Sequence, residues 1–315
     1  MKRRSFYAIV VVMSVALAVG IASCGKKQLG AKGGGKAYTV GVTLLTKEHP
    51  FYQELEAAMR ETAAEHNVKL NIQSAQFEME KQQSQIENFI TQHVDALVVC
   101  PVDSDTIGGA ITRANKAGIP VFTADIAANS GDVVCHVASD NVEGGRVAGE
   151  YMAKLLKGKG KIIIIDHPKV MSVVDRTKGF VEAISKYPGI KIVARPPGDG
   201  ERTTSMSVME NMLQSHPDIS GVFAINDSTS LGALAALRQS KRKDVVIVGY
   251  DGDPEAREEI LKGTPLKADA VQYPREIGST MIEMVVKYLN GEQVPKKVPV
   301  EVGIIDKASL EAETK

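Results

Sequence analysis

Short apolar runs rich in β-branched residues alternate with longer amphipathic segments from Tyr38 onward, and this alternation limits the possible folds more than any other feature of the chain. The apolar runs predict strands, and the segments with apolar residues at helical spacing predict helices. Repeated strand–helix units build parallel sheets covered by helices on both faces. We therefore expect an α/β protein.

The predicted strand–helix units form two sets, because the pattern restarts after the first. The first set has predicted strands at 38–45, 68–74, 95–100 and 119–125. The second has predicted strands at 132–140, 160–166, 190–195, 221–227 and 245–251. Each set is of about domain size, and 315 residues suffice for two ordinary domains. The remaining strand, helix and final strand can belong to either sheet; they are predicted at 266–272, 275–291 and 299–305.

The N-terminus has the pattern of an export signal. Basic residues at 2–4 precede an apolar run over 6–22, which ends just before Cys24. The residues around this cysteine resemble the bacterial lipobox, in which the thiol receives diacylglycerol; a short uncleaved membrane anchor is the alternative. We expect a lipoprotein signal peptide over 1–24 and a Gly- and Lys-rich flexible tether over 25–37.

The charge balance shows no excess of basic residues of the kind that nucleic-acid-binding proteins have. The chain has 38 Lys plus Arg and 38 Asp plus Glu, so its formal net charge is zero, and it has no Trp. Cys100 and Cys135 are expected to be buried thiols, with a disulfide formed after export as the alternative. No CxxC motif or His/Cys cluster has metal-ligand spacing, so no metal site is expected.

Acids, amides and aromatic rings follow the predicted strands. In parallel α/β sheets, ligands bind at this carboxyl end of the strands. Asp103, Ser104 and Asp140 precede helices and are interpreted as caps, whereas Asp125 and Asp251 stand directly at the ends of buried strands. These two carboxylates are therefore candidates for a binding site.

The stretch FAINDSTSLGAL over 223–234 joins a buried strand to a helix through polar residues. Asp227 or Ser228 can cap the helix. Asn226 stands one residue too early to cap well, and its amide offers both donors and an acceptor. We therefore assign capping to Asp227 and ligand contact to Asn226.

Carboxylates, amides, flat rings and a guanidinium suit a neutral polyhydroxyl ligand, because carboxylates accept from hydroxyl groups while arginine and amides donate to sugar oxygens. A phosphate would need a glycine-rich loop after a strand, and none occurs. No GxSxG or HExxH motif and no Cys–His pair placed by sequence is present, so we expect neither catalytic residues nor a cofactor. Of the six histidines, only His49 is placed in the pocket.

Many stretches together resemble the ribose-type periplasmic sugar-binding proteins, the receptors of ABC importers. They include PFYQEL, PVDSDTIGGAI, ANKAGIPVFTAD, HVASDNVEGGRVAGEYMAK, RTKGF, HPDISGVFAINDSTSLGALAAL and VVIVGYDGDPE. The resemblance implies the type I periplasmic binding protein fold, with two Rossmann-like lobes joined by a three-crossing hinge. It places 38–139 plus 273–301 in the N-terminal lobe and 140–272 plus 302–315 in the C-terminal lobe.

The resemblance also implies roles in the pocket. Phe51 and Tyr52 match the stacking aromatics, Asp125 the hydroxyl-accepting acid of the first lobe and Arg176 the ligand-binding arginine. Asn226, Asp251 and Gln272 match the amide, acid and hinge-side amide of the second lobe.

Some positions depart from the ribose-binder pattern and put ribose specificity in doubt. Ile126 and Cys100 replace an arginine and an asparagine, His49 replaces an asparagine, and Gly200 stands where an aromatic residue covers the sugar. Ser139, at the end of the first lobe, is a further candidate ligand residue. We expect a pentose, a hexose or a related polyol.

The expected function is that of a lipid-anchored, monomeric receptor. It would capture a monosaccharide in the periplasm or at the outer face of the cytoplasmic membrane, and deliver it to the permease subunits of an ABC importer. The alternative is a sugar or nucleoside sensor that signals to a chemoreceptor or histidine kinase. A lac-repressor-type regulator shares the two-lobe core, but an export signal occupies the place of its DNA-binding segment.

Overall fold

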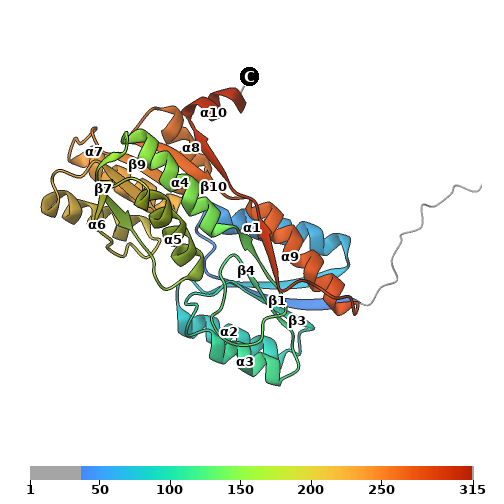
Figure 1. The fold of residues 1–315 in the computed structure, drawn as a ribbon. Helices are drawn as coiled ribbons and strands as arrows, with labels where there is room; N and C mark the ends of the chain where they lie inside the picture. Colours follow the sequence, from blue (N-terminus) through green and yellow to red (C-terminus); the bar gives the residue numbers. More distant parts are fainter. Residues whose placement is uncertain (1–36, 314–315) are drawn as a thin grey trace, which may run out of the picture. The chain divides into compact units, whose positions relative to one another are not determined.

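A computed structural model describes residues 37–313, which contain two six-stranded sheets (Figure 1). The first sheet has the order β11-β5-β4-β3-β1-β2, with β1 (Tyr38–Leu44), β2 (Val68–Ser74), β3 (Ala96–Val99), β4 (Val121–Ala124), β5 (His136–Ser139) and β11 (Lys297–Val300). The second has the order β12-β10-β9-β8-β6-β7, with β6 (Lys159–Ile165), β7 (Gly189–Ala194), β8 (Gly221–Ala224), β9 (Val246–Asp251), β10 (Leu266–Val271) and β12 (Gly303–Asp306).

Helices pack on both faces of each sheet. They are α1 (Pro50–Glu65), α2 (Met79–Thr91), α3 (Gly108–Lys116), α4 (Asn141–Leu155), α5 (Met171–Ser185), α6 (Arg202–Ser215), α7 (Asp227–Gln239), α8 (Pro254–Leu261), α9 (Pro274–Leu289) and α10 (Lys307–Glu313). Strand β6 shows why both faces must be covered. Ile162 and Ile164 pack in the same core as α4 and α5, while Ile163 and Ile165 pack with α6 and α7. The predicted α/β class, with parallel sheets and helices on both faces, is confirmed.

The prediction of one final strand over 299–305 is wrong, because the structure forms two strands there. β11 pairs in parallel with β5 of the first sheet, and β12 pairs antiparallel with β10 of the second. Each strand completes an edge of a different sheet, so the chain must change sheets between them. With the changes after β5 and after β10, the chain passes between the sheets three times.

Close packing of α4 on α5 fixes the helix that carries Arg176. A Cβ at Gly145 would lie 1.8 Å from the Arg176 carbonyl oxygen, and one at Gly179 would lie 1.9 Å from the Val142 carbonyl oxygen. Only glycine allows the two backbones to approach this closely. Within residues 37–313, no helix is both long enough and apolar enough to cross a membrane.

Candidate functional site

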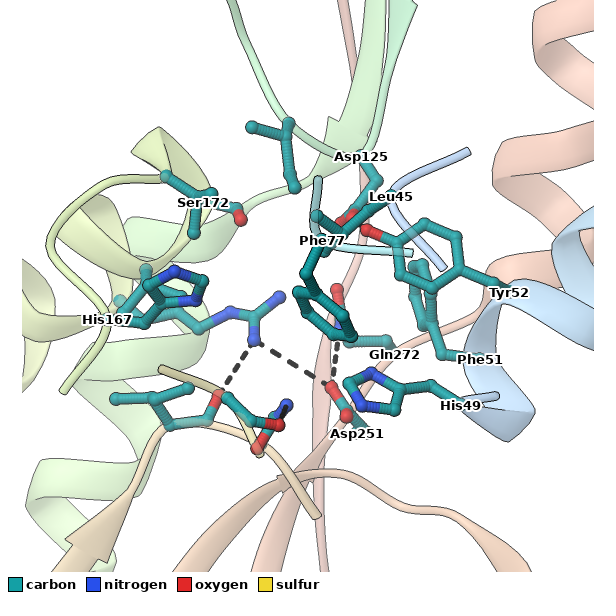
Figure 2. Close-up of a pocket in the computed structure, with 17 residues that line it drawn as sticks. Leu45, His49, Phe51, Tyr52, Phe77, Asp125, His167, Ser172, Asp251 and Gln272 are labelled. Carbon is teal, nitrogen blue, oxygen red and sulfur yellow. Dashed lines mark hydrogen bonds and ion pairs between the residues drawn. The ribbon is translucent and has the colours of Figure 1, made fainter. Parts of the chain in front are cut away.

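A cavity lies where strand ends of the two sheets meet (Figure 2). All seven residues expected to bind a ligand line it: Phe51, Tyr52, Asp125, Arg176, Asn226, Asp251 and Gln272. Three of the further candidates, His49, Ile126 and Gly200, also line it. Cys100 and Ser139 are buried but do not belong to its lining.

Asp125 follows β4 and is held against Tyr52. The Tyr52 hydroxyl donates to Asp125 Oδ2 at 2.6 Å, and the Asp125 backbone N–H donates to the Val137 carbonyl at 2.9 Å. The φ of Asp125 is 63°, a left-handed conformation that turns the carboxylate at the end of the strand. Its Oδ1 is buried and has no hydrogen-bond partner in the described protein. Burial raises the pKa of Asp125, while Arg176 and the Tyr52 hydrogen bond lower it.

Arg176 lies in α5 with its guanidinium held on several sides. Nε donates to Asn141 Oδ1 and Nη1 to the Ile225 carbonyl, both at 2.8 Å, and the guanidinium carbon lies 3.9 Å from the ring centroid of Tyr250. Nη1 also lies 3.8 Å from Asp251 Oδ1. These contacts fix a buried cation in one orientation at the cavity wall.

Asp251 is the last residue of β9, and Gln272 directly follows β10, its neighbour in the second sheet. Gln272 Nε2 donates to Asp251 Oδ1 at 2.7 Å, and the Gln272 backbone N–H donates to the Asp251 carbonyl at 3.0 Å. Gln272 Oε1 is buried and has no hydrogen-bond partner in the described protein. Burial raises the pKa of Asp251 to about 6, although Arg176 lowers it.

The assignment of capping to Asp227 is wrong. Asn226 is the N-cap of α7: its Oδ1 accepts from the Thr229 backbone N–H at 2.8 Å. Its Nδ2 donates to the Gly200 carbonyl at 3.1 Å. Asp227 is the first helical residue instead, and its Oδ2 accepts from the Asp253 backbone N–H at 2.7 Å. The same asparagine therefore caps a helix and faces the cavity.

Sequence reasoning missed several lining residues: Leu45, Phe77, His167, Val170, Ser172, Val173 and Ile225. The prediction that His49 is the only histidine in the pocket is wrong. His167 lies two residues after the end of β6 and also lines the cavity. The ring centroids of His49 and Phe77 lie 5.5 Å apart in an edge-to-face arrangement. Burial, with a contribution from His167, lowers the pKa of His49 to about 4, so its imidazole is neutral at neutral pH.

A cluster of carboxyl groups in the second sheet adjoins the cavity, with Asp227 and Asp269 buried and Asp251 and Asp253 half-buried. Asp227, Asp251 and Asp253 offer oxygens within 4.8 Å of one another, and the fully buried Asp269 lies beside Asp227. Backbone N–H groups donate to Asp227 and Asp251, and both α7 and α8 begin at the cluster. Helix N-termini favour carboxylates rather than cations. Burial and mutual repulsion raise the pKa of Asp269 to about 7 and that of Asp253 to about 8.

The two described cysteines, Cys100 and Cys135, are buried free thiols. Burial raises the pKa of the Cys100 thiol well above its usual value, with a further contribution from Asp125. The Cys100 carbonyl accepts from Gln82 Nε2 at 2.8 Å, which ties this strand end to α2. The expectation of buried thiols is confirmed for these two positions.

A family model described as periplasmic binding protein domain matches residues 40–293. The chain belongs to this family. Together with the relatives described next, this match confirms the prediction of a ribose-type, type I periplasmic binding protein, a class of substrate-binding proteins that are not enzymes.

Curated and solved relatives cover most of the chain. The ribose import binding protein of Salmonella typhimurium is 36% identical over 270 residues, covering 85% of this chain and 90% of the relative. The xylitol-binding protein of Mycolicibacterium smegmatis is 34% identical over 250 residues, covering 79% and 71%. An ABC transporter solute-binding protein of Bacillus halodurans with bound myo-inositol aligns with a TM-score of 0.81 and 29% identity, covering 88% of this chain and 97% of that one.

Proposed function

We propose that this protein binds a monosaccharide or related polyol in the cavity and delivers it to an ABC importer. One observation carries the proposal: Asp125 Oδ1 and Gln272 Oε1 are buried acceptors without partners, and both residues line the same cavity. A buried acceptor that lacks a donor costs about 1–3 kcal/mol. Ligand hydroxyl groups supply the donors.

The rest of the cavity complements a sugar. Arg176 and Asn226 offer N–H donors to ring and hydroxyl oxygens, and the rings of Phe51 and Phe77 can cover C–H faces. The names of three relatives give ribose, xylitol and myo-inositol as their ligands, all of which are neutral polyols. We infer the same ligand class here.

The ligand should be neutral rather than anionic. Two carboxyl groups, Asp125 and Asp251, face the cavity, and Arg176 already lies close to Asp251. An added anion would approach these acids in a poorly hydrated space, where repulsion is strong. The proposed ligands include pentoses, hexoses and cyclitols rather than ribose alone. Ile126 and Gly200 lack the polar and aromatic contacts expected of a ribose binder.

We infer that the lobes are 38–139 plus 273–301 and 140–272 plus 302–315, hinged at the three passages between the sheets. A ligand held by residues from both lobes binds the closed form better than the open form, and so shifts the equilibrium towards closure. The closed form is the one that we propose docks on the permease. We also propose that the receptor acts as a monomer and is anchored through lipid on Cys24, which lies outside the described residues together with most of the 25–37 tether.

A thermal-shift screen tests the proposal. Residues Lys36–Lys315 form one compact unit and can be used without the N-terminal segment. The panel holds D-ribose, other pentoses, hexoses, myo-inositol, xylitol, nucleosides and citrate as an anionic control. A ligand at about a thousand times its dissociation constant stabilises the fold by roughly 4 kcal/mol, a shift of several degrees. No response to any sugar or polyol would overturn the proposal, and a response to citrate alone would overturn the pocket chemistry.

A further inference from the structure

Ser104 makes two hydrogen bonds between the two halves of the structure. It lies in the loop between β3 and α3, and its backbone N–H donates to the Lys169 carbonyl at 2.9 Å. Its Oγ accepts from the Met171 backbone N–H at 3.0 Å. Lys169 lies between β6 and α5, and Met171 is the first residue of α5, so both belong to the other half. Ser104 is 2% exposed, whereas Met171 is half-buried and Lys169 is exposed, so the bonds are shielded from water on the Ser104 side.

The strand order separates these bonds from the hinge. The first passage leaves the first sheet at β5 and enters the second half through α4, which packs on β9, β10 and β12 before the chain reaches β6. The other two passages join β10 to β11 and β11 to β12. The crossings themselves therefore lie towards one edge of each sheet. Ser104 follows β3, whereas Lys169 follows β6, which neighbours the opposite edge strand β7. A rotation about the passages that opened the cavity would therefore draw Ser104 away from Lys169 and Met171.

The loop that presents Ser104 is itself fixed within the first half. The Asn129 backbone N–H donates to the Ser104 carbonyl at 2.8 Å. Asp103 Oδ1 accepts from the backbone N–H groups of Asp105 and Thr106, at 3.0 Å and 2.9 Å. The serine is held in place before closure, so little ordering is needed to form the two bonds.

We propose that Ser104 is a positioning residue that latches the closed form. Its two bonds stabilise closure without touching the ligand, since Ser104 does not line the cavity. The inference rests on the proposed function, because it explains how closure contributes to ligand affinity. The interpretation of Ser104 as a helix cap is replaced, because its Oγ accepts from a backbone N–H of the other half.

The latch predicts a characteristic effect on binding. In Ser104→Ala, closure leaves the half-buried Met171 N–H without its Ser104 acceptor, whereas in the open form water satisfies it. The cost falls on the closed state alone. Every ligand should therefore bind about five- to tenfold more weakly, by the same factor. A residue in the cavity would instead change the ratio of affinities between ligands.

The experiment compares Ser104→Ala with two controls. Ser104→Thr keeps the hydroxyl acceptor, and Thr106→Ala removes an exposed hydroxyl from the same loop. Calorimetric titration measures affinities for D-ribose, xylitol and myo-inositol, and thermal unfolding checks that each variant folds. A uniform loss in Ser104→Ala alone supports the latch. Unchanged affinities, or a loss that differs between ligands, would overturn it.

A second measurement separates failure of the latch from failure of the proposed function. Spin labels at Lys116→Cys in α3 and Gln214→Cys in α6, both exposed positions on different halves, report the distance between lobes without any ligand. Cys100 and Cys135 are buried and are replaced by serine only if they react. The latch predicts a smaller closed fraction in Ser104→Ala than in the parent. If no sugar binds but this shift occurs, the latch stands and the proposed ligand class does not.

Discussion

The Tyr52 hydroxyl donates a 2.6 Å hydrogen bond to Asp125 Oδ2, and both side chains are buried in the wall of the cavity. The bond leaves Asp125 Oδ1 as the free acceptor. Tyr52 thus decides which carboxylate oxygen is available to a ligand, and it holds that oxygen in one orientation. Burial and the nearby Asp125 charge raise the pKa of Tyr52 well above its usual value, so it remains a donor.

Replacing Tyr52→Phe should weaken sugar binding about tenfold while leaving the ring in place. Asp125 Oδ2 would lose its donor, and an unsatisfied buried acceptor costs about 1–3 kcal/mol. The pKa of Asp125 should rise further, because the hydrogen bond now lowers it. Calorimetric titration at several pH values measures both effects. An affinity equal to that of the parent protein would show that the bond does not orient Asp125.

Replacing Arg176→Lys should almost abolish binding, although the charge is kept. A lysine ammonium cannot reproduce the bonds to Asn141 and Ile225 together with the stack on Tyr250. We expect a loss of affinity of at least a hundredfold and a loss of stability of about 2–3 kcal/mol. Titration and urea unfolding measure the two losses. Lys178→Arg, on the exposed face of the same helix, serves as the control, and retained binding in Arg176→Lys would contradict the assignment.

The sequence was sufficient for the fold and for much of the cavity lining, because both follow from local patterns. Strand–helix alternation predicted the two sheets, and the rule that polar residues follow buried strands found Asp125 and Asp251. Phe77 escaped this rule because it lies three residues after β2, where its backbone has a φ of 61° and turns the ring inward. Where a side chain lies when it stands several residues after a strand depends on the conformation of the loop. The spacing of residues in the sequence does not predict that conformation.

Asn226 shows a second limit of the sequence. From the sequence, capping and ligand contact are alternatives for this residue, but its extended backbone lets Oδ1 cap α7 while Nδ2 donates to Gly200 at the cavity. Ser104 shows the same limit, because its partners lie 65 and 67 residues away in the other half. A residue whose role depends on distant backbone cannot be assigned from its neighbours in the chain.

The acid cluster predicts a pH dependence of stability. The pKa of Asp269 is about 7 in the folded protein, well above that of an unfolded aspartate. Between these values the native state binds more protons than the unfolded state, so stability is full below about pH 4 and falls as pH rises through about 7. In Asp269→Asn, the decrease in the free energy of unfolding over this pH range should be smaller by on the order of 2 kcal/mol. Urea unfolding across this range measures it.

The controls for this prediction must distinguish the acid cluster from other groups whose titration changes the stability. The pKa of His49 is lowered to about 4, so its contribution to stability is lost as pH falls from about 6.5, opposite in sign to that of Asp269. The same loss occurs in parent and variant, so their difference excludes His49. It reports Asp269 together with the neighbouring acids whose pKa values its charge raises, among them Asp253. Glu65→Gln, an exposed site, should leave the profile unchanged. Parallel profiles for the parent and Asp269→Asn would contradict the prediction.

Gly200→Ala should weaken both folding and binding, because the backbone there has a φ of 73° that disfavours a side chain. An added Cβ would also lie 3.3 Å from Asn226 Nδ2 and 3.4 Å from His167 Nδ1, within the cavity lining. We expect a loss of stability of about 1 kcal/mol, measured by urea unfolding, and a lower affinity in the sugar titration. Gly118→Ala is the matched control: its φ is 77°, but its Cβ would meet no atom within 4 Å. It should therefore lose stability without losing affinity, and equal affinity losses in both variants would show that contact with Asn226 is not the cause.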